Sequence, residues 1–398
     1  MTLTLGIFGT GVMGQRHIRG LDRLRRIGQL RYELAGICDI APVNAEKGAA
    51  LAEDLLGRRP QVFDSFEAMK RGLGQLDAIL ITTAPNTHAD LGIAAMQESV
   101  HVMVEKPIGL TVKQGWRLVD AADANDCRLA VAENYRRDPI NRLARALLNA
   151  GVVGRPYLAE QLSSGSGENV IITPWRHLRR SCGISVDMGV HYTDILEYLM
   201  GPIESVVGMG AVVDKQRRGS DGTLYPADAE DLTAGALRFK SGAIGVWLLD
   251  MAGRGAGHFS RMIHGTGGTL SIPGDRTGRP LQLVQRRGGD DVPIAPEDLL
   301  ALVPDFRLDP TTAALFGGDR LTSYDLPWAD IDAGLLAIEH DDFVSAILEH
   351  RAPEVSGEGG LRDLALMYGL LESERLGRIT HIEELISGAV SSYQDELE

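Results

Sequence analysis

Short apolar runs alternate with amphipathic stretches through residues 1–134. The apolar runs predict strands over 5–8, 32–38, 78–82, 101–104 and 128–132, and the stretches between them predict helices near 13–27, 41–56, 65–71, 88–98 and 112–125. Strands separated by helices of this length are typical of a parallel sheet with helical crossovers. Because such crossovers are right-handed, we expect a doubly wound sheet of the Rossmann type, α/β in class.

The pattern changes after Tyr135. A helix is predicted over 139–150, followed by strands near 157–162, 206–213, 232–239, 243–251, 261–265 and 281–285. Several strands without intervening helices indicate an antiparallel sheet, hence a second, α+β domain over 135–398. Residues 274–330, rich in Gly, Pro and Asp, are predicted to be a loop-like insertion, and closing helices within 338–377 are expected to pack back onto the body.

Composition and charge narrow the possible partners. A length of 398 residues fits two or three domains, and the net charge of -14 argues against nucleic acid, because there is no basic surplus to displace counterions. Three irregularly spaced cysteines, Cys38, Cys127 and Cys182, fit a reducing compartment. No basic leader precedes the first strand, and no run approaches the ~18 apolar residues of a membrane span, so we expect a cytoplasmic protein.

A glycine-rich loop follows the first predicted strand. Gly9-Thr10-Gly11-Val12-Met13-Gly14 has the spacing G-x-G-x-x-G and opens a predicted helix, which is the setting of a dinucleotide site. Gly9 would permit the tight turn, Gly11 the approach of the pyrophosphate, and Gly14 the close packing of helix and strand. The alternative is a flexible turn without a ligand.

Asp39 ends the second predicted strand. A carboxylate there can accept hydrogen bonds from the adenosine ribose and would repel a 2′-phosphate. No Arg or Lys follows directly, so the sequence favours NAD, with NADP not excluded. Asp39 could instead cap the next helix, and both roles could hold together.

Two further loops follow predicted strands. Glu105-Lys106-Pro107 places a lysine at the carboxyl end of a parallel strand, where this fold binds ligands. Its ammonium group could hold the nicotinamide ribose and lower the pKa of a substrate hydroxyl, although a surface lysine is the alternative. In the other loop, Thr83, Pro85 and Asn86 are candidates for contact with the cofactor. His88 is a candidate too, or a helix residue without chemistry.

Asp187 and His191 stand four residues apart in Asp187-Met188-Gly189-Val190-His191, so on a helix they would share a face. An imidazole titrates near neutral pH, and His191 could therefore take a proton from an alcohol as its carbon loses hydride. Asp187 could orient the substrate or the imidazole. The alternatives are a structural hydrogen-bonded pair and a metal pair, for which no third ligand has convincing spacing.

Taken together, these segments resemble the glucose-fructose oxidoreductase / inositol dehydrogenase / rhizopine catabolism (Gfo/Idh/MocA) family of NAD(P)-dependent oxidoreductases. The resemblance covers most of the chain and is most specific in the combination of the lysine turn with the downstream Asp-x-Gly-x-His. The other matching segments are Glu133-Asn134-Tyr135-Arg136, Trp175-Arg176, His264-Gly265-Thr266-Gly267-Gly268-Thr269-Leu270 and Ser356-Gly357…Leu361…Ser373…Gly377.

The resemblance implies a fold, a site and an activity. The fold is a Rossmann domain followed by an α+β domain with a large open, mainly antiparallel sheet. Lys106, Asp187 and His191 would be catalytic, with His191 as acid/base, and no resident metal is expected. Asn86, Glu105 and Asn134 would approach the nicotinamide half of the cofactor. The substrate contacts would come from Tyr135, Arg136, Trp175, Arg176 and Tyr192.

The expected activity is oxidation of a secondary hydroxyl of a sugar, glycoside or inositol by a homodimer or homotetramer. Three features depart from the family pattern: one residue fewer between Pro85 and His88, Cys182 where a glycine is common, and the insertion around 274–330. A redox-neutral epimerase or glycoside-cleaving enzyme with tightly bound NAD is one alternative. A non-catalytic regulator that senses dinucleotide is another, disfavoured by the presence of Lys106, Asp187 and His191 together.

Overall fold

The computed structural model describes residues 2–398, which form two compact units. The first consists of the residues up to Asn134 together with Pro327–Leu361, and the second of Tyr135–Leu326 with Arg362–Glu398. The chain thus changes unit where the sequence pattern changes. Residues 327–361, which that pattern left with the second domain, lie in the first unit.

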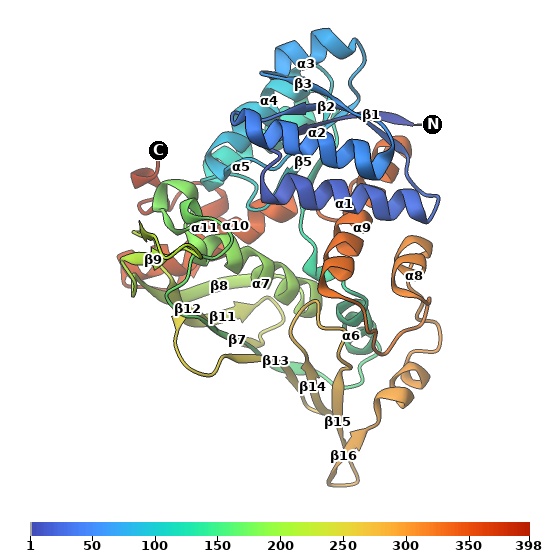
Figure 1. Cartoon of the computed structure of the whole chain (residues 1–398). Coiled ribbons are helices and arrows are strands. Elements are labelled where there is room, and N and C mark those ends of the chain that lie inside the picture. The colour runs from blue at the N-terminus through green and yellow to red at the C-terminus, as the bar shows by residue number, and fades with distance from the viewer. Residues whose placement is uncertain (1) are drawn as a thin grey trace. The chain divides into compact units, whose positions relative to one another are not determined.

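The first unit is built on a six-stranded sheet in the order β3-β2-β1-β4-β5-β6, and every pair of neighbours is parallel, as predicted (Figure 1). β4 and β6 are buried at every residue, which is typical of parallel strands covered on both faces. The strands are β1 (Leu3–Phe8), β2 (Tyr32–Cys38), β3 (Gln61–Phe63), β4 (Ala78–Ile81), β5 (His101–Glu105) and β6 (Leu129–Ala132).

Helices of the first unit follow its strands, and one comes from much later in the chain. α9 packs along α1, where the main chain around Leu336 and Ala337 lies 3.2–3.3 Å from the position a Gly20 Cβ would take. The helices are α1 (Val12–Arg26), α2 (Pro42–Leu56), α3 (Phe66–Leu73), α4 (His88–Gln97), α5 (Val112–Ala124) and α9 (Trp328–Leu348). The chain runs outward from β1 to β2 and β3 on one side and from β4 to β6 on the other, so the strand order switches direction between β1 and β4. Sheets of this kind bind ligands at such a switch point, beyond the carboxyl ends of the strands.

The second unit contains a nine-stranded, mostly antiparallel sheet in the order β16-β15-β14-β13-β7-β12-β11-β8-β17, which confirms the predicted class. Within the described part of this sheet, β7 and β12 form the one parallel pair, and the other neighbouring strands are antiparallel. Its strands are β7 (Pro156–Ser166), β8 (Ile203–Ala211), β11 (Leu232–Phe239), β12 (Ile244–Gly253), β13 (His258–Gly265), β14 (Gly268–Ile272), β15 (Gln282–Arg287), β16 (Asp290–Ile294) and β17 (Thr380–His381).

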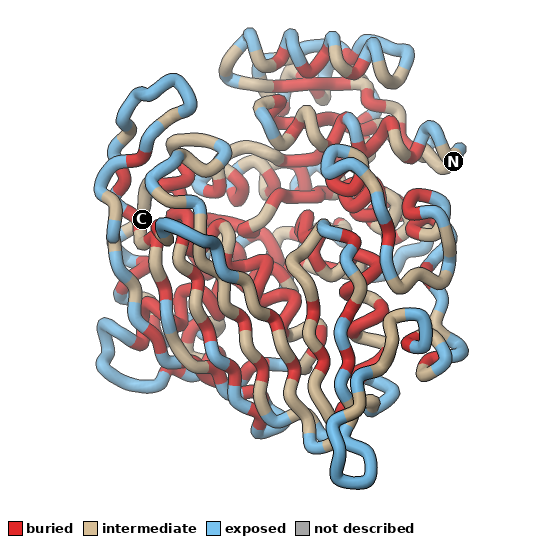
Figure 2. Tube along the Cα trace, turned by 60° about the horizontal axis from the view of Figure 1, so that its bottom comes forward, coloured by how far each residue is buried: buried red, intermediate tan, exposed pale blue. Residues whose placement is uncertain are grey.

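Buried and exposed residues alternate along these strands, because one face of the sheet packs on helices of the second unit (Figure 2). α7 contacts β7, β11 and β12 on the covered face. The remaining elements are β9 (Gln216–Arg218) and β10 (Leu224–Pro226), which pair with each other, and α6 (Pro139–Asn149), α7 (Ile184–Met200), α8 (Pro310–Phe316), α10 (Gly357–Leu376) and α11 (Ile382–Ile386).

The segment 274–330 is more regular than its composition predicts. β15 and β16 form an antiparallel hairpin at the sheet edge, turning at Gly288 and Gly289 with positive φ, and α8 follows. The glycines and prolines therefore mark turns between short elements. Within residues 2–398, no helix combines the length and apolarity needed to cross a bilayer.

Candidate functional site

Two of the three loop glycines, Gly9 and Gly14, occupy positions that exclude a side chain. Gly9 has φ +88°, and a Cβ on Gly14 would lie 2.1 Å from the carbonyl oxygen of Gly9. A Cβ on Gly11, in contrast, would meet no atom within 4 Å. The positive φ of the turn disfavours a side chain at Gly9, and the close contact between the helix and the loop excludes one at Gly14. The space beside Gly11 is open.

The amino end of α1 is suited to an anion. Gly11 is its N-cap, no side chain caps it, and no acidic residue lies in the first turn. The first N–H groups of a helix have no partner within the helix and attract phosphate. These groups fit a dinucleotide pyrophosphate.

Asp39 fastens the glycine loop to the end of β2. Its Oδ2 accepts a hydrogen bond from the Thr10 N–H at 2.7 Å, and its Oδ1 accepts one from the Ala41 N–H at 2.8 Å, just before α2. Each carboxylate oxygen can accept more than one hydrogen bond. Both predicted roles, at the start of the helix and toward a ribose, are therefore compatible.

Glu105 contacts His17, which in turn contacts His340, and the sequence singled out neither histidine. His17 Nε2 lies 3.0 Å from Glu105 Oε1, and His17 Nδ1 lies 3.1 Å from His340 Nε2. A neutral His17 that donates from Nε2 to Glu105 accepts at Nδ1, and His340 then donates from Nε2. Burial lowers the pKa of His340, and the nearby imidazole of His17 lowers it further, because two adjacent imidazoles disfavour charge on both. This chain runs from β5 through α1 to α9 within the first unit.

His88 links the two other predicted loops. Its Nδ1 lies 3.0 Å from the Pro107 carbonyl oxygen and its Nε2 lies 3.1 Å from that of Thr83. Burial lowers its pKa. Both ring nitrogens lie near main-chain carbonyl oxygens, so His88 joins the two loops, and its contact with the cofactor stays a prediction.

Lys106 and Asn134 belong to the first unit, as do Pro85 and Asn86. Lys106 follows β5 directly, and its peptide bond to Pro107 is cis. Asn134 is 5 % exposed, and its Oδ1 has no hydrogen-bond partner among the described residues. A buried carbonyl oxygen without a donor is costly, so this atom is suited to a donor on a ligand, such as a cofactor amide or hydroxyl.

In the second unit, Asp187 and His191 share a face of α7, as predicted. The Asp187 carboxylate accepts a hydrogen bond from Arg176 Nη1 at 2.5 Å. The His191 ring stacks on Tyr135, with centroids 4.2 Å apart and an interplanar angle of 9°. The helix thus presents a paired carboxylate and an oriented imidazole.

The other predicted substrate residues surround this face. Arg136 is paired with Asp194, one turn further along α7, through a 2.9 Å hydrogen bond to Oδ2. Tyr192 is buried with its ring 5.9 Å from that of Tyr135. Arg176 lies over the ring of Trp175, 4.7 Å from its centre. Both arginines therefore have carboxylate partners.

Cys182 precedes α7 with φ +82°, and its Sγ is 3.5 Å from the hydroxyl of the buried Tyr368. All three cysteines are buried and unbridged. No cluster of three or more metal-ligating side chains occurs among residues 2–398.

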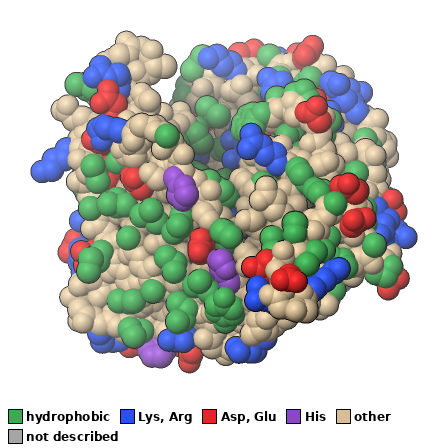
Figure 3. Space-filling model, turned by 90° about the horizontal axis from the view of Figure 1, so that it is seen from below, with side chains coloured by type: hydrophobic (Ala, Val, Ile, Leu, Met, Phe, Trp, Pro, Cys, Tyr) green, Lys and Arg blue, Asp and Glu red, His purple; other side chains and the backbone are tan. Residues whose placement is uncertain are grey.

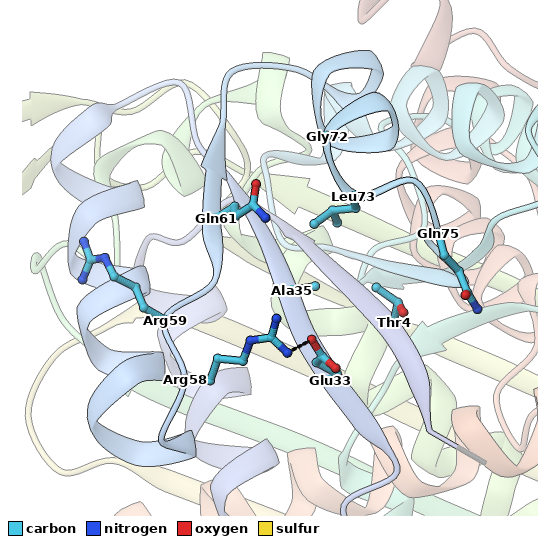
Figure 4. Close-up of a pocket in the computed structure, with 9 residues that line it drawn as sticks. All are labelled: Thr4, Glu33, Ala35, Arg58, Arg59, Gln61, Gly72, Leu73 and Gln75. Atoms are coloured by element: carbon cyan, nitrogen blue, oxygen red, sulfur yellow. Dashed lines mark hydrogen bonds and ion pairs between the residues drawn. The ribbon is translucent and has the colours of Figure 1, made fainter.

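A polar pocket in the first unit lies away from the glycine loop (Figure 4). It opens at the amino ends of β1, β2 and β3, beside Thr4, Glu33 and Gln61, whereas the glycine loop follows the carboxyl end of β1. Arg58 is paired with Glu33, and Arg59 with Glu46 and Glu53. Because its cations are already neutralised, we assign it no ligand.

Two sequence profiles of one family match the chain. "Oxidoreductase family, NAD-binding Rossmann fold" matches residues 3–133, and "GFO/IDH/MocA C-terminal domain" matches residues 141–271. Among characterised relatives, the chain is 27% identical to myo-inositol 2-dehydrogenase of Thermotoga maritima over 61% of this chain and 67% of the relative. It is 25% identical to 1,5-anhydro-D-fructose reductase of Ensifer adhaerens over 90% of this chain and 94% of the relative.

Solved structures share the fold. An NAD-binding oxidoreductase from Klebsiella pneumoniae superposes with a TM-score of 0.77 at 24% identity, covering 96% of this chain and 99% of the other. Levoglucosan dehydrogenase in complex with NADH and levoglucosan gives a TM-score of 0.75 at 21% identity, covering 96% and 100%. The chain belongs to the Gfo/Idh/MocA family of oxidoreductases and carries its NAD-binding Rossmann domain.

Proposed function

We propose that this protein is a dehydrogenase that oxidises a secondary hydroxyl of a sugar, glycoside or inositol-type polyol. The observation that carries the proposal is the paired presentation of Asp187 and His191 on one face of α7, in a chain with an NAD-binding domain. The relatives named for inositol and levoglucosan act on compounds of this class, which supports the same class here.

In this proposal His191 accepts the hydroxyl proton at an imidazole nitrogen as the carbon loses hydride. NAD, when bound, supplies the hydride acceptor. The Lys106 ammonium stabilises the negative charge that develops on the substrate oxygen, and Asp187 orients the substrate hydroxyls. In the reverse direction, His191 returns the proton to a carbonyl oxygen.

The cofactor would be held by the first unit. The open space at Gly11 and the uncapped start of α1 fit the pyrophosphate, and Asp39 would accept from the adenosine ribose. The bare Oδ1 of Asn134 fits a donor on the nicotinamide half. We assign the remaining contacts with the cofactor to Thr10, Val12, Met13, Thr83, Pro85, Asn86, Glu105 and Lys106.

The substrate contacts favour a neutral ligand. Arg136 and Arg176 already pair with carboxylates, so their positive charges are compensated. The half-buried ring of Trp175 could pack against the apolar face of a sugar ring, whereas Tyr135 and Tyr192 are buried. We therefore propose an uncharged polyol or glycoside as substrate.

A screen for NADH formation over polyols, sugars and glycosides tests the proposal, with Lys106→Ala and His191→Ala as comparison variants. We expect turnover of at least one compound, with loss of rate in both variants. An active compound that both variants oxidise at the full rate would contradict the assigned roles. NAD that survives purification, together with turnover without net NADH, would favour the redox-neutral alternative.

Asp39 should set the choice of cofactor. We expect the protein to use NAD in preference to NADP, and Asp39→Asn to shift the ratio of kcat/KM toward NADP by about tenfold, or ~1.4 kcal/mol, because the carboxylate repels a 2′-phosphate. Since Asp39 also binds the Thr10 N–H, NADH affinity should fall as well. If the protein with its native Asp39 used NAD and NADP equally well, this role of Asp39 would be refuted.

The face of the large sheet away from α7 is proposed to join subunits into a homodimer or homotetramer. Hydrophobic side chains gather there (Figure 3), among them Val207, Ile244, Val246 and Met209, which is 71% exposed. Sedimentation velocity should show a dimer or tetramer, and Met209→Lys should shift it toward monomer. A protein that sediments as a monomer at micromolar concentration would contradict this assembly.

A cytoplasmic location stays a prediction.

A further inference from the structure

Arg276, in the segment between β14 and β15, reaches the proposed acid/base histidine through one tyrosine. Its Nη2 donates a hydrogen bond to the Tyr135 hydroxyl at 3.2 Å, and its guanidinium carbon lies 5.2 Å from the centre of the Tyr135 ring. The same ring is the one that stacks on His191. Tyr135, which is buried, therefore contacts the arginine and the histidine at once.

The backbone of Arg276 is held in place by a buried carboxylate. Arg276 has φ +60°, which is uncommon for a residue other than glycine. Its N–H donates to Asp138 Oδ2 at 3.0 Å, and Asp138 also accepts from the Tyr324 hydroxyl at 2.8 Å and from the Ile140 N–H at 2.9 Å. Burial nevertheless raises the pKa of Asp138 to about 6. The segment is thus tied to the start of α6.

The preceding residue is anchored in the same way. Asp275 accepts hydrogen bonds from Arg261 Nη1 at 2.7 Å and Nη2 at 2.9 Å, and from Asn141 Nδ2 at 2.9 Å. Arg261 is 1% exposed, so this ion pair is shielded from water and salt. Asp275 and Arg276 are thus fixed to α6 and β13. This anchoring places the Arg276 side chain within hydrogen-bond distance of Tyr135.

An imidazole on a rigid helix still has a soft torsion. The last torsion of a histidine side chain is broad and roughly two-fold, and a parallel ring 4.2 Å away restricts it. Proton transfer to a bound hydroxyl depends on this orientation. We propose that Arg276 is a positioning residue for His191: it fixes the ring of Tyr135, which in turn fixes the plane of the imidazole. This rests on the proposed function of His191.

The test uses the full chain with NAD and a substrate from the screen. We expect Arg276→Met and Tyr135→Phe each to lower kcat about tenfold and to change KM less than about threefold, because the imidazole is misoriented while binding persists. The double variant should lose no more than either single variant, since both break the same contact. Arg279→Met, which alters an exposed arginine of the same segment, should keep the full rate.

The His191→Asn background separates positioning from general structural damage. There, Arg276→Met should cause no further loss of rate, whereas damage to the fold would lower it again. A full rate in His191→Asn alone would overturn the proposed function of His191. If His191→Asn loses rate but Arg276→Met keeps the full rate, only the positioning role is overturned. Strictly additive losses in the variant that combines Arg276→Met with Tyr135→Phe would also overturn that role alone.

A second measurement needs no turnover. With histidine isotope-labelled at Cε1, the NMR signal of His191 is the one that disappears in His191→Asn. We expect Arg276→Met to shift or broaden this signal and Arg279→Met to leave it unchanged. An identical His191 signal in Arg276→Met would overturn the proposal.

Discussion

His191→Asn should lower kcat by about 10²–10⁴-fold, the range expected when a general acid/base is removed. Asparagine keeps a polar side chain of similar reach at the position of Nδ1 but cannot accept a proton near neutral pH. Hydride transfer would then leave the hydroxyl proton without an acceptor. Steady-state rates with a substrate from the screen measure the effect.

Cofactor binding supplies the control for this variant. The glycine loop belongs to the first unit and His191 to the second, so NADH affinity should be unchanged in His191→Asn. Loss of NADH binding together with kcat would indicate misfolding. A rate within about threefold of the unchanged protein would instead remove His191 from the acid/base role.

Gly11→Ala and Gly14→Ala should separate cofactor binding from stability. A methyl group on Gly11 meets nothing within 4 Å in the protein, but it enters the space assigned to the pyrophosphate. A methyl group on Gly14 would overlap the Gly9 carbonyl oxygen at 2.1 Å. We expect Gly11→Ala to weaken NADH binding at least about tenfold at an almost unchanged melting temperature.

Gly14→Ala should in addition lower the free energy of unfolding by about 1–3 kcal/mol, the usual cost of forcing atoms into a packed site. Fluorescence titration with NADH and thermal unfolding of both variants measure the difference. If Gly11→Ala bound NADH normally, the pyrophosphate would have to lie elsewhere. Equal melting temperatures in the two variants would contradict the predicted loss of stability. They would mean that α1 can move away from the end of β1 at little cost.

The features that could be predicted from the sequence depend on residues close together in the chain. The order of apolar runs predicts the parallel sheet, because buried strands such as β4 need apolar residues at every position. β3 was missed since it is a three-residue strand with two exposed residues and carries no such run. The face shared by Asp187 and His191 follows from helix geometry alone.

Contacts between distant segments carry no comparable signal. His17 and His340 are 323 residues apart, so nothing in either stretch predicts their hydrogen bond. Arg276 lies in a segment expected to be a loop, and its contact with Tyr135 depends on the buried anchors at Asp138 and Asp275. α9 is buried on most sides, so its pattern shows no face that would assign it to a unit.

The return of Pro327–Leu361 to the first unit has a consequence for biosynthesis. The glycine loop, Asp39 and Glu105 leave the ribosome early, but His340 and the helix that packs on α1 follow only after the whole middle of the chain. Until α9 has been synthesised, the side of α1 that contacts it, including His17 and Gly20, lacks its packing partner. A gene fragment that stops at Asn134 would omit this partner of α1 altogether.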